Sequence, residues 1–142
     1  MFSYATLGSN DLDKSVAFYL ELLKEQGAKT LIKMDRIVFI GKSMQSPMLA
    51  ICIPYNKEPA TPGNGTMLSI APGTKEKVDE LYHKALALGA SCEGAPGQRI
   101  EKTFYGAYVR DLDGNKLCFN HFGFLFVFQE SFHLWSGFFN RH

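Results

Sequence analysis

The chain has 142 residues, and its 15 Lys and Arg residues nearly balance its 14 Asp and Glu residues. This length suits one domain with a sizeable core, and the balanced charge gives no electrostatic reason to expect a nucleic acid or a membrane as a partner. The three cysteines are widely spaced, form no CxxC pair, and no secretory leader pattern follows Met1. These features predict a reduced, cytoplasmic protein.

The first half of the chain predicts a strand, a helix and three further strands. Residues 4–7 are strand-like, and Asn10 and Asp11 offer capping oxygens to a helix that ends at Gly27. Apolar residues of this helix recur at helical spacing, among them Ala17, Leu20 and Leu23. The three further strands are expected at residues 29–33, 36–40 and 48–53.

A turn-rich segment then separates two similar halves. Pro59, Pro62, Gly63 and Gly65 cannot continue a helix or a strand. After them come a strand at 66–71, a helix opened by Thr74 and closed after Leu88 by a glycine, and strands at 90–93, 103–110 and 116–120. We therefore predict a first module at about 1–58, a linker at 59–65, a second module at 66–122 and a C-terminal extension at 123–142.

Alternation along the strands separates two faces of each sheet, because successive side chains point to opposite sides. The helices need an apolar face to cover. The residues assigned beneath them are Ala5, Leu7, Leu68, Ile70, Leu117 and Phe119. The opposite, concave face is predicted to carry Tyr4, Thr6, Met67, Ser69, Tyr108, Arg110, Lys116, Cys118 and Asn120.

Several segments together resemble one known group of proteins. These are residues 4–8 with 10–12 and 17–19, then 63–66, 93–97 and above all 108–117 (YVRDLDGNKL). Over residues 1–122 the chain resembles the vicinal-oxygen-chelate superfamily, which contains glyoxalases, bleomycin-resistance proteins and extradiol dioxygenases. The resemblance implies an α+β fold of two βαβββ modules, whose curled mixed sheets form a cup with helices outside. In such proteins the cup holds a divalent metal and a small substrate or drug.

The same resemblance shows that the usual metal ligands are replaced. The positions that usually carry two histidines and a glutamate hold Tyr4, Met67 and Cys118. A phenol, a thioether and a lone thiol are poor substitutes for imidazole and carboxylate around such an ion. We therefore expect no standard metal site and no cofactor.

The sequence alone does not decide between a binding site and a purely structural role for these residues. A ligand pocket or a filled core could both use the side chains of Tyr4, Met67 and Cys118. Cys118 could also be a nucleophile, but it is more typical of a buried, unreactive thiol. Arg110 could bind a carboxylate or phosphate, or pair with Asp111 or Asp113 at the rim. No catalytic role is assigned to His83, His121, His133 or His142.

The extension at 123–142 is strongly aromatic and contains the single tryptophan, Trp135. Residues 124–128 are apolar on both faces, which predicts an enclosed segment: a dimer interface, a lid over the cup or an extra core element. Three functions follow as hypotheses. The first is a metal-independent small-molecule-binding protein, which we expect to be a homodimer. The second is a lyase, isomerase or dioxygenase with rearranged metal ligands, and the third is an interaction protein that uses the aromatic extension.

Overall fold

The computed structural model describes residues 1–123 and contains the predicted order of elements twice. Module 1 consists of β1 (Tyr4–Gly8), α1 (Leu12–Leu22), the short 3-10 helix η1 (Lys24–Gln26), β2 (Lys29–Lys33), β3 (Ile37–Gly41) and β4 (Met48–Cys52). Module 2 consists of β5 (Leu68–Ile70), α2 (Lys75–Ala87), β6 (Ser91–Ile100), β7 (Phe104–Arg110) and β8 (Lys116–Phe122). The fold is α+β with two βαβββ-like modules.

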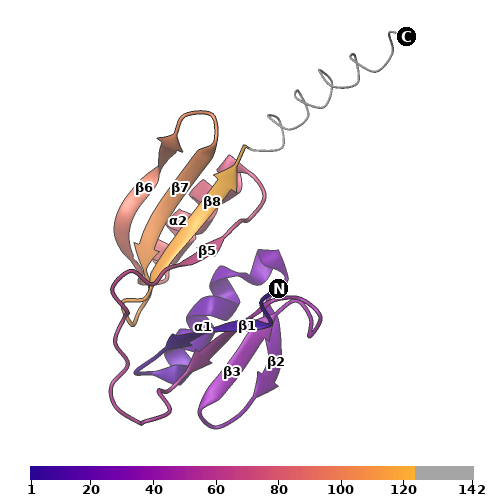
Figure 1. The fold of residues 1–142 in the computed structure, drawn as a ribbon, viewed down its shortest axis with the longest axis vertical. Helices are drawn as coiled ribbons and strands as arrows, with labels where there is room; N and C mark the ends of the chain where they lie inside the picture. The colour runs from indigo at the N-terminus through magenta and orange to yellow at the C-terminus, as the bar shows by residue number, and fades with distance from the viewer. Residues whose placement is uncertain (124–142) are drawn as a thin grey trace, which may run out of the picture.

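Each module has its own four-stranded mixed sheet. The strand orders are β1-β4-β3-β2 and β5-β8-β7-β6, and in each sheet the first strand runs parallel to the last strand of its module. The modules stack along the long axis of the molecule, and the segment between β4 and β5 passes along one side (Figure 1). The two sheets of one chain are separate, so no continuous sheet through both modules closes the expected cup.

Both helices begin where the sequence predicts. The Asp11 side chain accepts a hydrogen bond from the Lys14 amide at 3.2 Å, and the Thr74 hydroxyl accepts one from the Lys77 amide at 3.2 Å. These caps satisfy amides that the first helical turn leaves free. Within residues 1–123, neither helix is long and apolar enough to cross a membrane.

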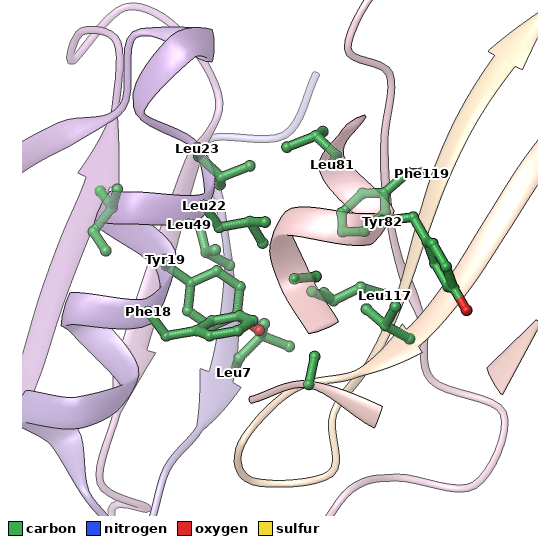
Figure 2. Packing of buried hydrophobic residues seen from close by; sticks show 14 of the residues in the cluster. Leu7, Phe18, Tyr19, Leu22, Leu23, Leu49, Leu81, Tyr82, Leu117 and Phe119 are labelled. Carbon is green, nitrogen blue, oxygen red and sulfur yellow. The ribbon is translucent and has the colours of Figure 1, made fainter. Parts of the chain in front are cut away.

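One hydrophobic core joins the two modules. The side chains of Leu22 and Tyr19 in α1 are fully buried, and they face Leu81 of α2 and Leu117 of β8 across the module boundary (Figure 2). Ala17, which shares the helical spacing of Leu20 and Leu23, is exposed. The buried face of α1 is formed by aromatic and leucine side chains that pack against the second module.

A buried polar network lies beside this core. The Tyr19 hydroxyl donates a hydrogen bond to Asp111 Oδ2, and Asn115 Nδ2 donates to Gly8 O at 2.9 Å. At the surface, the Asn10 amide donates to Asp113 Oδ1 at 2.7 Å. These bonds link α1 and the end of β1 to the turn between β7 and β8, so they fix one module against the other.

The aromatic extension lies outside the described residues, except for Gly123. The three roles that its composition suggests stay predictions. His133 and His142 lie in the same part of the chain.

Candidate functional site

The face of each sheet that points away from the common core carries the residues predicted for the cup. In module 1 this face, called here the module 1 face, carries Tyr4, Thr6 and Phe39. The Tyr4 ring is 48% exposed and lies edge-on to the Phe39 ring, with 5.0 Å between the centroids. The module 1 face is therefore largely apolar, with one exposed phenol.

The corresponding surface of module 2 is polar and is called here the module 2 face. It carries Ser69, Tyr108, Arg110, Lys116, Cys118 and Asn120. Register places these side chains together, because Cys118 pairs with Ser69 on one side and with Tyr108 on the other. Seven of the nine residues predicted for the concave face belong to module 2, and six of these seven lie on this face.

A buried amide is only half satisfied on the module 2 face. Asn120 is 4% exposed, and its Nδ2 donates a hydrogen bond to the Ser69 hydroxyl. Its Oδ1 is buried and has no hydrogen-bond partner among the described residues. Such an acceptor costs about 1–3 kcal/mol when it stays unpaired. The position next to Asn120 Oδ1 therefore favours a group that donates a hydrogen bond.

Two cations flank the ring of Tyr108. The Arg99 guanidinium carbon and the Lys116 ammonium each lie 5.4 Å from the ring centroid. Attraction to the electron-rich ring holds the two positive groups over the module 2 face. Burial and the neighbouring Cys118 raise the pKa of the Tyr108 phenol, while the Arg99 charge opposes that rise. The phenol is therefore a neutral hydrogen-bonding group at physiological pH.

Arg110 forms an ion pair with Glu93, a partner that the sequence did not predict. Its Nε donates to Glu93 Oε1 at 2.5 Å, and a second guanidinium nitrogen donates to Gly114 O at 3.2 Å. Glu93 lies where the register of β6 against β7 shifts between Cys92 and Gly94, so it is an extra residue without a partner on β7. The suggested pairing of Arg110 with Asp111 or Asp113 was wrong, because Asp111 accepts its hydrogen bonds from Tyr19, Asp113 and Asn115.

The Cys118 side chain is fully buried between its neighbours. Burial raises the pKa of the Cys118 thiol, and interactions with Ser69, Asn120 and Tyr108 partly oppose the rise. The thiol is therefore protonated at neutral pH, and a protonated thiol is a poor nucleophile and a poor metal ligand.

A cavity of about 780 Å³ opens beside the module 2 face. The linker before β5 forms one wall, and Glu93, Arg110 and Lys116 form the other. Met67, which is 44% exposed, lies at the end of the linker and borders the same cavity. The volume is within the range of small-molecule sites, which are commonly about 300–1,000 Å³.

The structure thus divides the predicted site residues into two groups. Met67, Ser69, Tyr108, Arg110, Cys118 and Asn120 lie on or beside the module 2 face, whereas Tyr4 and Thr6 lie on the other sheet. Sequence reasoning missed Arg99 and Glu93. Both lie in β6, where three register shifts disrupt the alternation that assigns side chains to faces.

Comparison with known proteins identifies the family. The model of the Glyoxalase/Bleomycin resistance protein/Dioxygenase superfamily matches residues 2–119. The chain belongs to this superfamily. A search of curated proteins found no match.

Solved structures of superfamily members support the assignment. A glyoxalase/bleomycin resistance protein from Albidiferax ferrireducens T118 is 37% identical, with a TM-score of 0.75, and the alignment covers 85% of this chain and 98% of that one. A glyoxalase/bleomycin resistance protein/dioxygenase family enzyme from Burkholderia phytofirmans PsJN is 23% identical, with a TM-score of 0.70 and coverages of 83% and 95%. A lactoylglutathione lyase from Agrobacterium tumefaciens is also 23% identical, with a TM-score of 0.62 and coverages of 84% and 92%. The last two likenesses concern the fold alone.

The divalent-metal site that the superfamily implies does not fit these residues. Tyr4 offers a phenol in place of an imidazole, and the buried Cys118 thiol has a raised pKa, which disfavours the thiolate that a metal requires. Met67 offers a thioether, which is a poor ligand for a hard divalent ion. Within residues 1–123, no cluster of three or more His, Cys, Asp or Glu side chains is arranged to hold a metal ion.

Proposed function

We propose that this superfamily member binds a small molecule on the module 2 face and does not use the standard divalent metal for this purpose. The observation that carries the proposal is the buried, unpaired Asn120 Oδ1 on this face. Buried polar atoms in proteins nearly always have a partner, so this acceptor is suited to a donor group of a ligand or of an ordered water. The cavity bordered by Arg110 and Lys116 adjoins one end of this face and has room for a small molecule.

We further propose that a second copy of the chain completes the site. In one chain, the module 1 face with Tyr4 and Thr6 belongs to a separate sheet from the module 2 face. A cup needs two such faces opposite each other. In a two-fold dimer, the module 1 face of each copy covers the module 2 face of the other, which forms two equal cups.

The sheet edges support this arrangement. Each sheet has two edges, and unpaired edge strands attract other strands unless charges or bulges protect them. The outer edges are protected: β2 carries Lys29 and Lys33 and has a register shift, and β6 has three shifts. The inner edges, β1 and β5, carry no charged residue and have regular register. We therefore propose that β1 of one copy pairs with β5 of the other.

A charged residue on one edge strand tests this dimer. Thr6→Lys places a charge on β1, and Thr30→Lys places the same charge on the protected strand β2 as a matched control. Size-exclusion chromatography with light scattering should give twice the 15.9 kDa chain mass for the wild type and the control, and a lower mass for Thr6→Lys. A wild-type protein of single-chain mass contradicts the dimer, as does a Thr6→Lys variant that stays fully dimeric.

Ligand binding itself is tested on protein purified without chelator. Elemental analysis measures divalent metal for each chain, and native mass spectrometry detects a retained organic molecule. The proposal expects far less than one metal ion per chain and an organic adduct that Asn120→Leu reduces. Near-stoichiometric metal that is lost in Cys118→Ser contradicts it and favours an enzyme with rearranged ligands.

A further inference from the structure

We infer that the ligand of the module 2 face carries an anionic group, which Arg99 and Lys116 bind beside the ring of Tyr108. This inference rests on the proposed function, because it assigns a chemical class to the ligand of the same face. The class is a small organic anion with a carboxylate or a phosphate, which also has a hydroxyl or N–H group at its other end.

The module 2 face carries an excess of positive charge. Arg99, Arg110 and Lys116 are cationic, and one of them, Arg110, is paired with Glu93 at 2.5 Å. In residues 1–123 no salt bridge is formed by Arg99 or by Lys116. The Lys116 charge also contributes to the lowered pKa of Glu93, so one carboxylate faces three cations and the face keeps a net positive charge. An anionic group that binds there is attracted by both cations, and solvent screens the half-buried Lys116 less than the exposed Arg99.

Contacts within the protein hold the side chains of Arg99 and Lys116 in place. The Arg99 guanidinium donates a hydrogen bond to Ala95 O and lies over the Tyr108 ring, so part of its donor set is fixed in the protein. Arginine has five N–H donors, which leaves donors for a ligand. Lys116 lies over the same ring and borders the cavity. Both cations are thus positioned before a ligand arrives, which lowers the entropy cost of binding.

The geometry of β8 sets the distance between the two ends of the ligand. Lys116, Cys118 and Asn120 follow each other on one face of β8, because they are two residues apart along the strand. Cys118 pairs with Tyr108, so Asn120 lies roughly 7 Å along the strand from the level of the Tyr108 ring. One molecule of metabolite size spans the distance from Arg99 and Lys116 to Asn120. Asn120 Oδ1 lies below the surface of the face, so a donor group reaches it when the side chains that cover it move aside. Between the two ends the molecule passes over the buried Cys118.

The chain offers a matched control for these cations. Lys75 lies 5.5 Å from the centroid of the Tyr105 ring, which is the same contact on the opposite face of β7. Tyr105 also donates a hydrogen bond to Asp79 of α2, so this second cation–ring pair belongs to the helix side of the sheet. Lys75→Gln therefore removes a comparable charge and contact without touching the module 2 face.

The experiment is a ligand-observed NMR screen of the full-length protein against matched sets of small aromatic and aliphatic compounds. Each scaffold carries a hydroxyl group and is present as a carboxylate, a phosphate ester and a neutral amide. We expect the carboxylates or phosphates to bind in preference to their amides, with the two anions ranked by the same titration. The Arg99→Gln/Lys116→Gln variant should bind the best anion about 10- to 100-fold more weakly, and Lys75→Gln should bind it as the wild type does.

Each outcome separates this inference from the function on which it rests. Equal binding of amides and anions to the wild type leaves small-molecule binding intact and overturns the anionic ligand. Anion binding that is unchanged in the double variant also overturns it. If no compound of any charge binds and the purified protein retains no organic molecule, the proposed function itself fails. Should the double variant unfold, the salt dependence of wild-type binding decides: affinity for the anion must fall as ionic strength rises, and constant affinity refutes the inference.

Discussion

The hydrogen bond from Tyr19 to Asp111 joins the two modules within their buried interface, and its removal tests how the modules are held together. Tyr19 lies in α1 and is fully buried, while Asp111 follows β7 and is 6% exposed. Tyr19→Phe deletes the hydroxyl and leaves the ring, so no large cavity forms. Burial and the Asp111 carboxylate raise the pKa of Tyr19 well above its usual value, so the hydroxyl is protonated and donates at neutral pH.

The expected magnitude follows from the partners that remain. Without the hydroxyl, Asp111 keeps hydrogen bonds from the Asp113 amide at 2.9 Å and from Asn115, whose amide and Nδ2 donate at 2.8 Å and 3.0 Å. Loss of one hydrogen bond to a buried charged group costs about 1.5–3 kcal/mol. For a chain of this size, that corresponds to a fall in Tm of roughly 6–12 °C.

The assay is urea unfolding together with differential scanning calorimetry of wild type and variant at one protein concentration. Tyr4→Phe is the matched control, because its ring is 48% exposed and the change should alter the free energy of unfolding by less than about 0.5 kcal/mol. A Tyr19→Phe variant whose Tm stays within about 1 °C of the wild type would refute the claim that this bond stabilises the module interface.

Three further predictions concern the core, the thiols and the ion pair of the module 2 face. Leu22→Ala, at a fully buried position, should lower the free energy of unfolding by about 2–5 kcal/mol in urea titrations, and a loss below about 1 kcal/mol contradicts the assigned core. Iodoacetamide at neutral pH should alkylate the exposed Cys92 well before Cys118, whose thiol is buried and has a raised pKa; peptide mass spectrometry that finds Cys118 modified first rejects this. Arg110 lowers the pKa of Glu93 below its ordinary value of 4.5, so the ion pair is complete above that value and is lost as pH falls through the lowered pKa. Urea unfolding should therefore show the stability difference between wild type and Glu93→Gln shrinking as pH falls from about 6 to about 3, whereas a difference that grows in acid contradicts this assignment.

The sequence predicted the elements well where local signals were strong. Asp11 and Thr74 mark helix starts because their side chains accept hydrogen bonds from the first turn, and both do so. The strand at residues 29–33 has the predicted bounds. The prediction for β6 stopped at residue 93, whereas the strand continues to Ile100, because register shifts around Gly94 and Gly97 disrupt the alternation on which strand prediction depends.

The candidate site was harder to predict because it depends on contacts between distant segments. Alternation assigned Tyr108, Cys118 and Asn120 to one face, as the register shows. It could not show that Tyr4 belongs to a separate sheet, since pairing between modules has no local signal. It also did not find the partner of Arg110, because the pairing of β6 with β7 that brings Glu93 to the guanidinium is a contact between separate strands. On α1, helical spacing fitted more than one face, and packing against the second module selected the face with Tyr19.

The central claim, that the module 2 face is the binding site, is tested most directly by chemical-shift mapping. Backbone amide resonances of the full-length protein are assigned and followed while the best anion from the screen is added. The account predicts that the largest shifts cluster at Tyr108, Lys116, Cys118 and Asn120, and at Arg99 in β6. Shifts confined to the helices or to the outer strands β2 and β3 would contradict it.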